Sequence, residues 1–175
     1  SARDVCMTVG ASGAMNAVLR TLLDPGDEVI VLAPYFVEFL AYVGNHGGVP
    51  RVVKTGPDFM PDLAAIEAAI DSRTKAIILN SPNNPSGVVY TEALIAELAA
   101  LLTRKERELG RELYIISDEP YRRIIFDGLT PVSVFNHYRN SVVVSSHSKD
   151  LALPGERIGY AALNPSADDH DNIMA

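Results

Sequence analysis

Residues 142–149 read Val-Val-Val-Ser-Ser-His-Ser-Lys, a stretch in which an apolar run becomes polar within a few positions. The three consecutive β-branched residues predict a strand that is covered on both of its faces. Hydroxyl groups and a single lysine, Lys149, follow that strand. Ligands of open parallel sheets gather where strands end, so this lysine is a candidate site residue. It can act as an anion clamp, a general base or an amine that condenses with a carbonyl group, and its neighbours must decide between these roles.

The rest of the chain alternates between short apolar runs and amphipathic helical patterns. The predicted strands cover residues 5–9, 28–32, 49–53, 76–79, 113–116, 142–148 and 158–163. Asp62 and Thr91 are expected to cap two of the intervening helices. The last strand follows its predecessor too closely for a helical crossover, so we expect it to be antiparallel. The pattern predicts an α/β fold, a three-layer α/β/α sandwich with a mostly parallel sheet of about seven strands.

The composition and charge of the chain argue against several classes of binding partner. The 175 residues include 15 Lys and Arg against 22 Asp and Glu, and the net charge of -7 disfavours nucleic acid or an anionic membrane as the main partner. The one cysteine, Cys6, excludes an intrachain disulfide and suits a reducing cytoplasm. Its strand-like surroundings predict a buried thiol rather than a nucleophile. No apolar run is long enough to span a bilayer, so we expect a cytoplasmic protein.

A turn of small residues, Gly10-Ala11-Ser12-Gly13, joins the first predicted strand to the first helix. Free backbone N–H groups and the positive end of a helix dipole make such a turn suitable for a phosphate group, with the Ser12 hydroxyl as a further donor. An equally good interpretation makes Ser12 a simple helix N-cap. The spacing matches neither the dinucleotide fingerprint nor the P-loop.

Further polar or aromatic motifs follow other strands. Tyr35 and Phe36 can pack into the core or present a flat face to a planar ligand. Residues 80–87 form a stiff loop rich in asparagine and proline, which turn chemistry alone would explain. Asp118 can cap the turn that Pro120 begins, or it can stand at the floor of a pocket. The histidines at 137, 147 and 170 show no metal-ligand spacing, so we expect no metal site.

Together these groups suit one cofactor. A small-residue helix entry, several hydroxyls and an arginine suit a phosphate monoester, and an aromatic side chain suits a planar ring. An aspartate facing that ring can hold a ring nitrogen protonated, and a lysine can form an imine with an aldehyde. Pyridoxal 5′-phosphate requires this set of partners.

Three motifs make a family resemblance specific. The chain contains Asn84-Pro85-Ser86-Gly87, then Ser117-Asp118-Glu119-Pro120-Tyr121, then Ser146-His147-Ser148-Lys149 followed by Gly155-Glu156-Arg157-Ile158-Gly159. In order and spacing these resemble the signatures of fold-type-I pyridoxal-phosphate enzymes. Within that group the chain is similar to the class I/II aminotransferases, in the branch that includes bacterial aspartate aminotransferases. The resemblance extends over nearly the whole chain.

The resemblance implies roles around the cofactor ring. Lys149 would be the Schiff-base lysine, which also moves the proton between the substrate Cα and the cofactor C4′. Asp118 would pair with the pyridinium nitrogen. Tyr121 and Asn84 would hydrogen-bond the phenolic oxygen, and Phe36 would stack on the ring face.

The resemblance also implies a phosphate cradle. Ala11 and Ser12 would contribute amides and a hydroxyl, and Ser146 and Ser148 would contribute further hydroxyls. Arg157 would add a guanidinium, whose bidentate geometry a lysine does not offer.

The activity implied is amino transfer between an amino acid, aspartate or a similar one, and a 2-oxo acid, in two stages that use Lys149 as acid and base. Family members are longer, so residues 1–175 are expected to be the large, cofactor-binding domain without the N-terminal arm and the C-terminal small domain. We therefore expect impaired activity in this chain, and a homodimer in the full-length protein.

Three alternatives stay open at the level of sequence. The first is a β-lyase or another fold-type-I enzyme, because the cofactor motifs are shared. The second is a non-catalytic module that binds pyridoxal phosphate. The third is a plain nucleotide-binding α/β domain, which would leave Asp118 and Lys149 unexplained.

Overall fold

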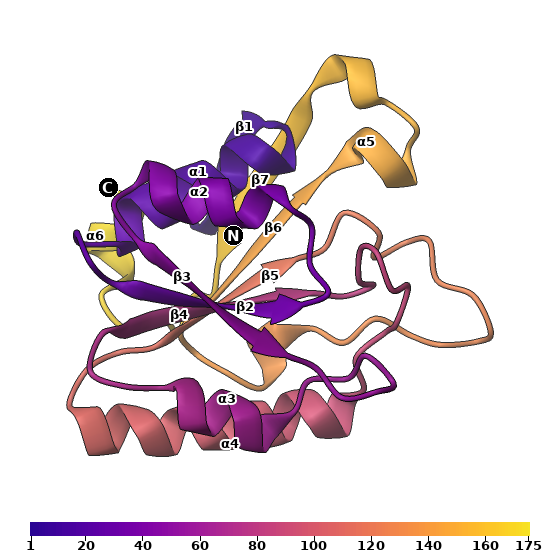
Figure 1. Ribbon diagram of the computed structural model, residues 1–175. Coiled ribbons are helices and arrows are strands. Elements are labelled where there is room, and N and C mark those ends of the chain that lie inside the picture. Colours follow the sequence, from indigo (N-terminus) through magenta and orange to yellow (C-terminus); the bar gives the residue numbers. More distant parts are fainter.

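A seven-stranded sheet forms the centre of the molecule in the computed structural model, which describes residues 1–175 (Figure 1). Its strands are β1 (Val5–Val9), β2 (Glu28–Ala33), β3 (Val49–Lys54), β4 (Thr74–Asn80), β5 (Tyr114–Asp118), β6 (Ser141–Ser146) and β7 (Ile158–Leu163). The spatial order is β1-β7-β6-β5-β4-β2-β3. All four pairings among β2 to β6 are parallel, and β7 is antiparallel to both of its neighbours. The predicted mostly parallel sheet with an antiparallel last strand is confirmed.

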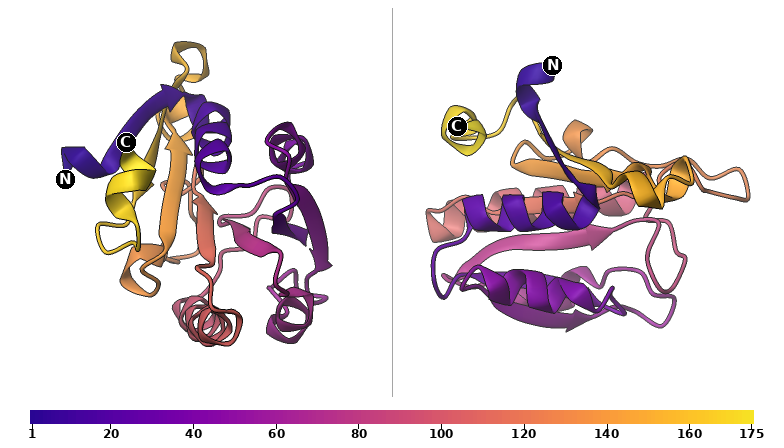
Figure 2. Two further views of the ribbon diagram at one scale, coloured as in Figure 1. Left: turned by 90° about the vertical axis from the view of Figure 1, so that its left-hand side faces the viewer. Right: turned by 90° about the horizontal axis from the view of Figure 1, so that it is seen from above.

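Helices cover both faces of this sheet, and Figures 1 and 2 show the resulting three layers. The α-helices are α1 (Gly10–Leu22), α2 (Glu38–Asn45), α3 (Leu63–Ala69), α4 (Glu92–Leu109), α5 (His147–Asp150) and α6 (His170–Met174). Three 3₁₀ turns complete the chain, η1 (Ala2–Asp4), η2 (Val134–Asn136) and η3 (Pro154–Glu156). Helices α1 and α2 lie on one face, while α3 and α4 lie on the other. No helix is long and apolar enough to cross a membrane.

Strand β2 shows how the sequence produces this double cover. Val29 and Val31 point into the core beneath α1 and α2, whereas Ile30 and Leu32 point into the core beneath α3 and α4. All four side chains are buried. A strand that is apolar at every position therefore suits the centre of a covered parallel sheet, because each face needs an apolar partner.

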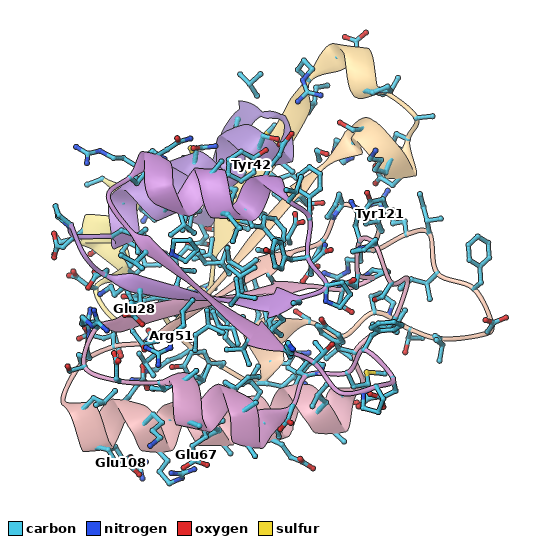
Figure 3. All side chains as sticks on the ribbon, in the orientation of Figure 1. Glu28, Tyr42, Arg51, Glu67, Glu108 and Tyr121 are labelled. Carbon is cyan, nitrogen blue, oxygen red and sulfur yellow. The ribbon has the colours of Figure 1, made fainter.

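Local signals set the helix ends as predicted. The Asp62 carboxylate accepts hydrogen bonds from two backbone N–H groups at the start of α3, and the Thr91 hydroxyl accepts one at the start of α4. Helix α4 ends at Leu109 and is capped by Gly110, whose φ of 66° is the left-handed conformation that glycine favours. Arg104, near the end of α4, pairs with Glu67 and Glu108. Figure 3 shows Glu67 and Glu108 on the outer side of the α3 and α4 layer.

Several sequence predictions need correction. The strand predicted over residues 142–148 ends at Ser146, because His147 and Ser148 belong to helix α5. The central strands β4 and β5 extend to Asn80 and Asp118, so these polar side chains belong to the strands rather than to the loops after them. The thiol of Cys6 is exposed rather than buried. Cys6 lies in β1, which pairs only with β7 and forms an edge of the sheet, so only one side of this strand is protected by a neighbour.

Candidate active site

The carboxyl ends of the central strands open into a cavity of about 310 Å³, bounded by α1, α2 and α5. All ten residues proposed as site residues from sequence line it, namely Ala11, Ser12, Phe36, Asn84, Asp118, Tyr121, Ser146, Ser148, Lys149 and Arg157. They come from widely separated parts of the chain. Parallel strands bring them together because their carboxyl ends meet at one edge of the sheet.

Asp118 lies at the floor of the cavity as the last residue of β5, with only 8% of its surface exposed. Its Oδ2 accepts a hydrogen bond of 3.0 Å from Asn80 Nδ2, and its other carboxylate oxygen has no protein partner. Burial, assisted by the nearby Glu119, raises the pKa of Asp118 to about 7. Of the two interpretations drawn from sequence, the geometry fits the pocket floor, since no backbone N–H is capped by this carboxylate.

Asn80 also fixes the loop that carries Asn84. The Asn80 Oδ1 accepts a hydrogen bond of 2.6 Å from the backbone N–H of Asn84. Further along, Asn83 Oδ1 accepts from both the N–H and the hydroxyl of Ser86. Sequence analysis named Asn84 but missed Asn80, which holds both Asp118 and the asparagine loop in place.

Lys149 belongs to the short helix α5, which follows β6 directly. Its Nζ lies 5.9 Å from the centre of the Tyr121 ring. Tyr121 lies beyond the ends of the central strands, on the same side of the molecule as α5 (Figure 3). Asp150, next to Lys149, contacts the ring of His147 at 3.3 Å and Arg123 Nε at 3.7 Å. These contacts connect α5 with the segment that carries Tyr121.

Arg157 and Gly10 form a compact corner of the cavity. The Gly10 N–H donates a hydrogen bond of 2.8 Å to the carbonyl oxygen of Arg157. A Cβ at Gly10 would lie only 2.6 Å from Arg157 Nη2, and Gly10 has a φ of 69°. Glycine is favoured here, because other residues rarely adopt this φ and a Cβ would displace the guanidinium.

Ser12 is not the N-cap of α1. The helix begins at Gly10, its N-cap Val9 makes no side-chain cap, and Ser12 lies within the first turn. The Ser12 Oγ lies 2.8 Å from the Tyr42 hydroxyl, which also contacts the Glu38 carboxylate. Tyr42 and Glu38 line the cavity as well, and sequence analysis missed both. Their spacing of four residues on α2 was the available signal, because it puts both on one helix face.

The cavity has the features that a phosphate-bearing pyridine ring needs. Arg157 makes no ion pair, and its Nη1 donates only to the carbonyl oxygen of Pro154, at 3.3 Å. Lys149 makes no ion pair either. The cavity therefore holds two cations without carboxylate partners, beside the hydroxyls of Ser146 and Ser148, which suits an anionic group. The aromatic Phe36 is part of the same lining, and Asp118, which also lines the cavity, keeps a free oxygen. The residues present fit pyridoxal phosphate.

Comparison with known proteins identifies one family. The model of the family described as aminotransferase class I and II matches residues 1–175. A probable aspartate/prephenate aminotransferase of Thermus aquaticus is 41% identical over 162 residues, which are 90% of this chain and 40% of that relative.

Solved structures show the same similarity. An aminotransferase of Eubacterium rectale superposes with a TM-score of 0.97 at 41% identity, over 99% of this chain and 44% of that one. An aspartate aminotransferase of Thermotoga maritima superposes with a TM-score of 0.88 at 32% identity, over 99% of this chain and 45% of that one. The chain thus spans less than half the length of the proteins it matches.

Proposed function

The chain belongs to the class I and II aminotransferase family, and from that premise we propose that residues 1–175 form the cofactor-binding large domain of a pyridoxal-phosphate-dependent aminotransferase. One observation carries the proposal: a buried carboxylate, Asp118, and an unpaired lysine, Lys149, line one cavity together with the unpaired guanidinium of Arg157. An electron-withdrawing ring, an aldehyde and a phosphate on a single ligand would engage all three groups.

When bound, pyridoxal phosphate supplies an aldehyde carbon and a ring that accepts the electron pair released at the substrate Cα. In this proposal Lys149 would hold the aldehyde carbon through its amine until the amino group of a substrate takes its place, and the freed Nζ would then hold and move the proton at the substrate Cα. The Tyr121 ring beside the lysine restricts where Nζ can lie. Tyr121 and Asn84 would donate hydrogen bonds to the phenolic oxygen, and Phe36 would cover one face of the ring.

Asp118 has the environment that its proposed role requires. Its pKa of about 7 describes a carboxyl group with no cation beside it, because burial penalises the charged form. A protonated ring nitrogen next to the free oxygen would favour the ionised carboxylate, and the carboxylate would in turn keep that nitrogen protonated. Asn80 holds the other oxygen, so Asp118 keeps its orientation toward the cavity.

The phosphate cradle in this proposal lies between α1, α5 and Arg157. The Ala11 and Ser12 amides are at the start of α1, where backbone N–H groups are unpaired and the helix dipole is positive. Ser146 and Ser148 contribute hydroxyls from the end of β6 and from α5. Arg157 provides the charge that neutralises the anion.

The proposed substrates are an amino acid, aspartate or a similar one, and a 2-oxo acid. The support is the similarity to aspartate/prephenate aminotransferases, together with the family to which the chain belongs. A homodimer and a cytoplasmic location for the full-length protein are further parts of this proposal.

An absorbance spectrum after addition of pyridoxal phosphate tests the proposal. We expect a pH-sensitive band, displaced from that of the free cofactor and resistant to dialysis, that disappears in Lys149→Ala. Lys54→Ala is the matched control, because Lys54 is an exposed lysine of β3 outside the cavity. Identical free-cofactor spectra for the wild type and Lys149→Ala would contradict the proposal.

A further inference from the structure

The lysine of the proposed site belongs to a helix that has little support of its own. Helix α5 is a single turn without a side-chain N-cap. An isolated turn is unstable by itself, because its nucleation fixes several dihedral angles for few hydrogen bonds. Residues 151–158, which follow α5, are all exposed, and Figure 1 shows α5 and this loop extending away from the centre of the sheet. Other contacts must therefore hold Lys149 beside the cavity.

The Asp150 side chain is largely buried, although it follows the lysine directly. Only 9% of its surface is exposed, compared with 30% for the His147 side chain at the start of the same turn. A buried carboxylate needs partners, because burial without them penalises its charge. The structure supplies such partners from α5 itself and from a neighbouring segment.

The partners of Asp150 connect the lysine-bearing turn with the chain around Tyr121. Asp150 Oδ1 accepts a hydrogen bond of 2.9 Å from the backbone N–H of Leu151 and lies 3.3 Å from His147 Nδ1. Asp150 Oδ2 lies 3.7 Å from Nε of Arg123, which follows Tyr121 closely in the chain. The carboxylate thus joins both ends of α5 to each other and to a second segment that borders the cavity.

Lys149 takes no part in these contacts. It makes no ion pair, and its Nζ lies 5.9 Å from the centre of the Tyr121 ring. The carboxylate of the next residue is instead committed to His147 and Arg123. The lysine amine therefore stays free, while the turn that carries it is fixed. Nothing in the proposed amino transfer uses Asp150.

We propose that Asp150 is a positioning residue for Lys149, because its carboxylate fixes α5 against the Tyr121 segment and so directs the amine into the cavity before a cofactor binds. The inference rests on the proposed function, since it concerns the lysine that would bind pyridoxal phosphate. A turn that is already ordered loses less conformational entropy when its lysine bonds to the aldehyde. Asp150 thereby strengthens the binding of a ligand that it does not contact.

Asp150→Asn separates the charge of this side chain from its shape. The amide oxygen can still accept from the Leu151 N–H, but Arg123 loses its anionic partner. We expect the dissociation constant of pyridoxal phosphate, measured by equilibrium dialysis, to rise about tenfold. Asp150→Glu keeps the charge and should recover most of the affinity, which a backbone cap alone would not require. Asp24→Asn is the matched control and should change nothing, because Asp24 is an exposed aspartate just before β2, at the end of the sheet opposite the cavity.

A double-mutant cycle shows whether the effect of Asp150 passes through the lysine. In a Lys149→Ala background no bond to the aldehyde forms, so Asp150→Asn should weaken binding of pyridoxal phosphate by less than about twofold. Ser148, the other residue of α5 in the proposed site, is present in both backgrounds, and its contribution cancels in the comparison.

Arg123→Gln tests the same contact from its other side. The Arg123 side chain is 69% exposed, so this variant is expected to fold. The dissociation constant should rise by a smaller factor, about threefold, because ion pairs with an exposed partner are weak. In the Asp150→Asn background the same substitution should have no further effect, since the contact is already lost.

Each result bears on the inference. An unchanged dissociation constant in Asp150→Asn, or an equal loss of affinity with and without Lys149, would overturn it. If Asp150→Asn does not fold, Arg123→Gln decides, and wild-type affinity in that variant would overturn the inference as well. If the wild type shows the Lys149-dependent absorbance band in these cases, the proposed function survives and only the inference fails. Absence of that band in the wild type would remove both proposals.

Discussion

At the scale of single residues, the raised pKa of Asp118 makes the stability of the folded protein depend on pH. Burial raises its pKa from the usual 3.8 to about 7 in the folded protein without cofactor. Below pH 4 the Asp118 carboxyl group is protonated in both the folded and the unfolded state, so its burial does not lower the free energy of unfolding. As the pH rises toward 7 the unfolded state loses the proton first, and the folded state is destabilised by up to about 4 kcal/mol.

Asp118→Asn removes the pH dependence of stability and keeps an oxygen that can accept the hydrogen bond from Asn80. We therefore expect Asp118→Asn to raise the free energy of unfolding relative to wild type at pH 8, and to do so much less at pH 4. Urea unfolding of the cofactor-free protein at both pH values measures the difference. Asp127→Asn, on an exposed turn, is the control. Equal effects of Asp118→Asn at pH 4 and pH 8 would rule out the raised pKa.

Sequence motifs predicted many of the residues that line the cavity, because these motifs lie at the ends of strands or shortly after them. Lys149, Asp118 and Asn84 are visible in this way, since parallel topology alone brings strand ends together. Tyr42 and Glu38 were missed, because they reach the cavity from the first two turns of α2. Their spacing of four residues places them on one helix face, but it does not show toward which neighbour that face turns.

At the scale of elements, β7 joins the edge strand β1 to the strand that leads into α5. Gly159 of β7 pairs with Thr8 of β1 on one side and with Ser146 of β6 on the other. A Cβ at Gly159 would lie 2.2 Å from the carbonyl carbon of Gly10, a backbone atom that cannot rotate away. The start of α1 therefore packs directly on the backbone of β7.

Gly159→Ala should consequently lower the free energy of unfolding by about 3 kcal/mol, because backbone rather than a flexible side chain must move. Gly155→Ala is a matched control, since a Cβ there meets nothing within 4 Å, and it should change stability by less than about 0.5 kcal/mol. Chemical denaturation of the two variants gives the comparison. Equal stability of Gly159→Ala and Gly155→Ala would show that α1 and β7 can separate at no cost.

The elements themselves were largely predictable, and the differences lie at strand ends. Apolar runs located all seven strands, but two predicted strands ended too early, at Leu79 and Ile116, because polar residues follow these positions. A polar residue can remain part of a strand when its side chain has a hydrogen-bonding partner on the neighbouring strand. The hydrophobic pattern of a sequence does not detect such a residue. In β4 and β5 the two polar residues are partners of each other, because Asn80 Nδ2 donates a hydrogen bond to Asp118 Oδ2.

At the scale of the whole molecule, the order of the strands decides which apolar residues are covered. Strand β1 reads like an interior strand, yet it forms an edge, and Met7 and Val9 are 65% and 69% exposed. An apolar strand pattern does not reveal whether one neighbour or two will pair with it. The prediction of a buried Cys6 failed for this reason.

Cys6 provides a direct test of this arrangement, because it is the only thiol of the 175 residues. Its side chain lies on the β1 edge and lines an apolar hollow formed by α1, β6, β7 and the end of the chain. We expect a disulfide reagent such as dithiobis(nitrobenzoate) to modify one thiol per chain without denaturant, at a rate close to that of a free cysteine. Cys6→Ser should abolish the reaction. A thiol that reacts only above the urea concentration that unfolds the sheet would instead mean that β1 is covered in solution.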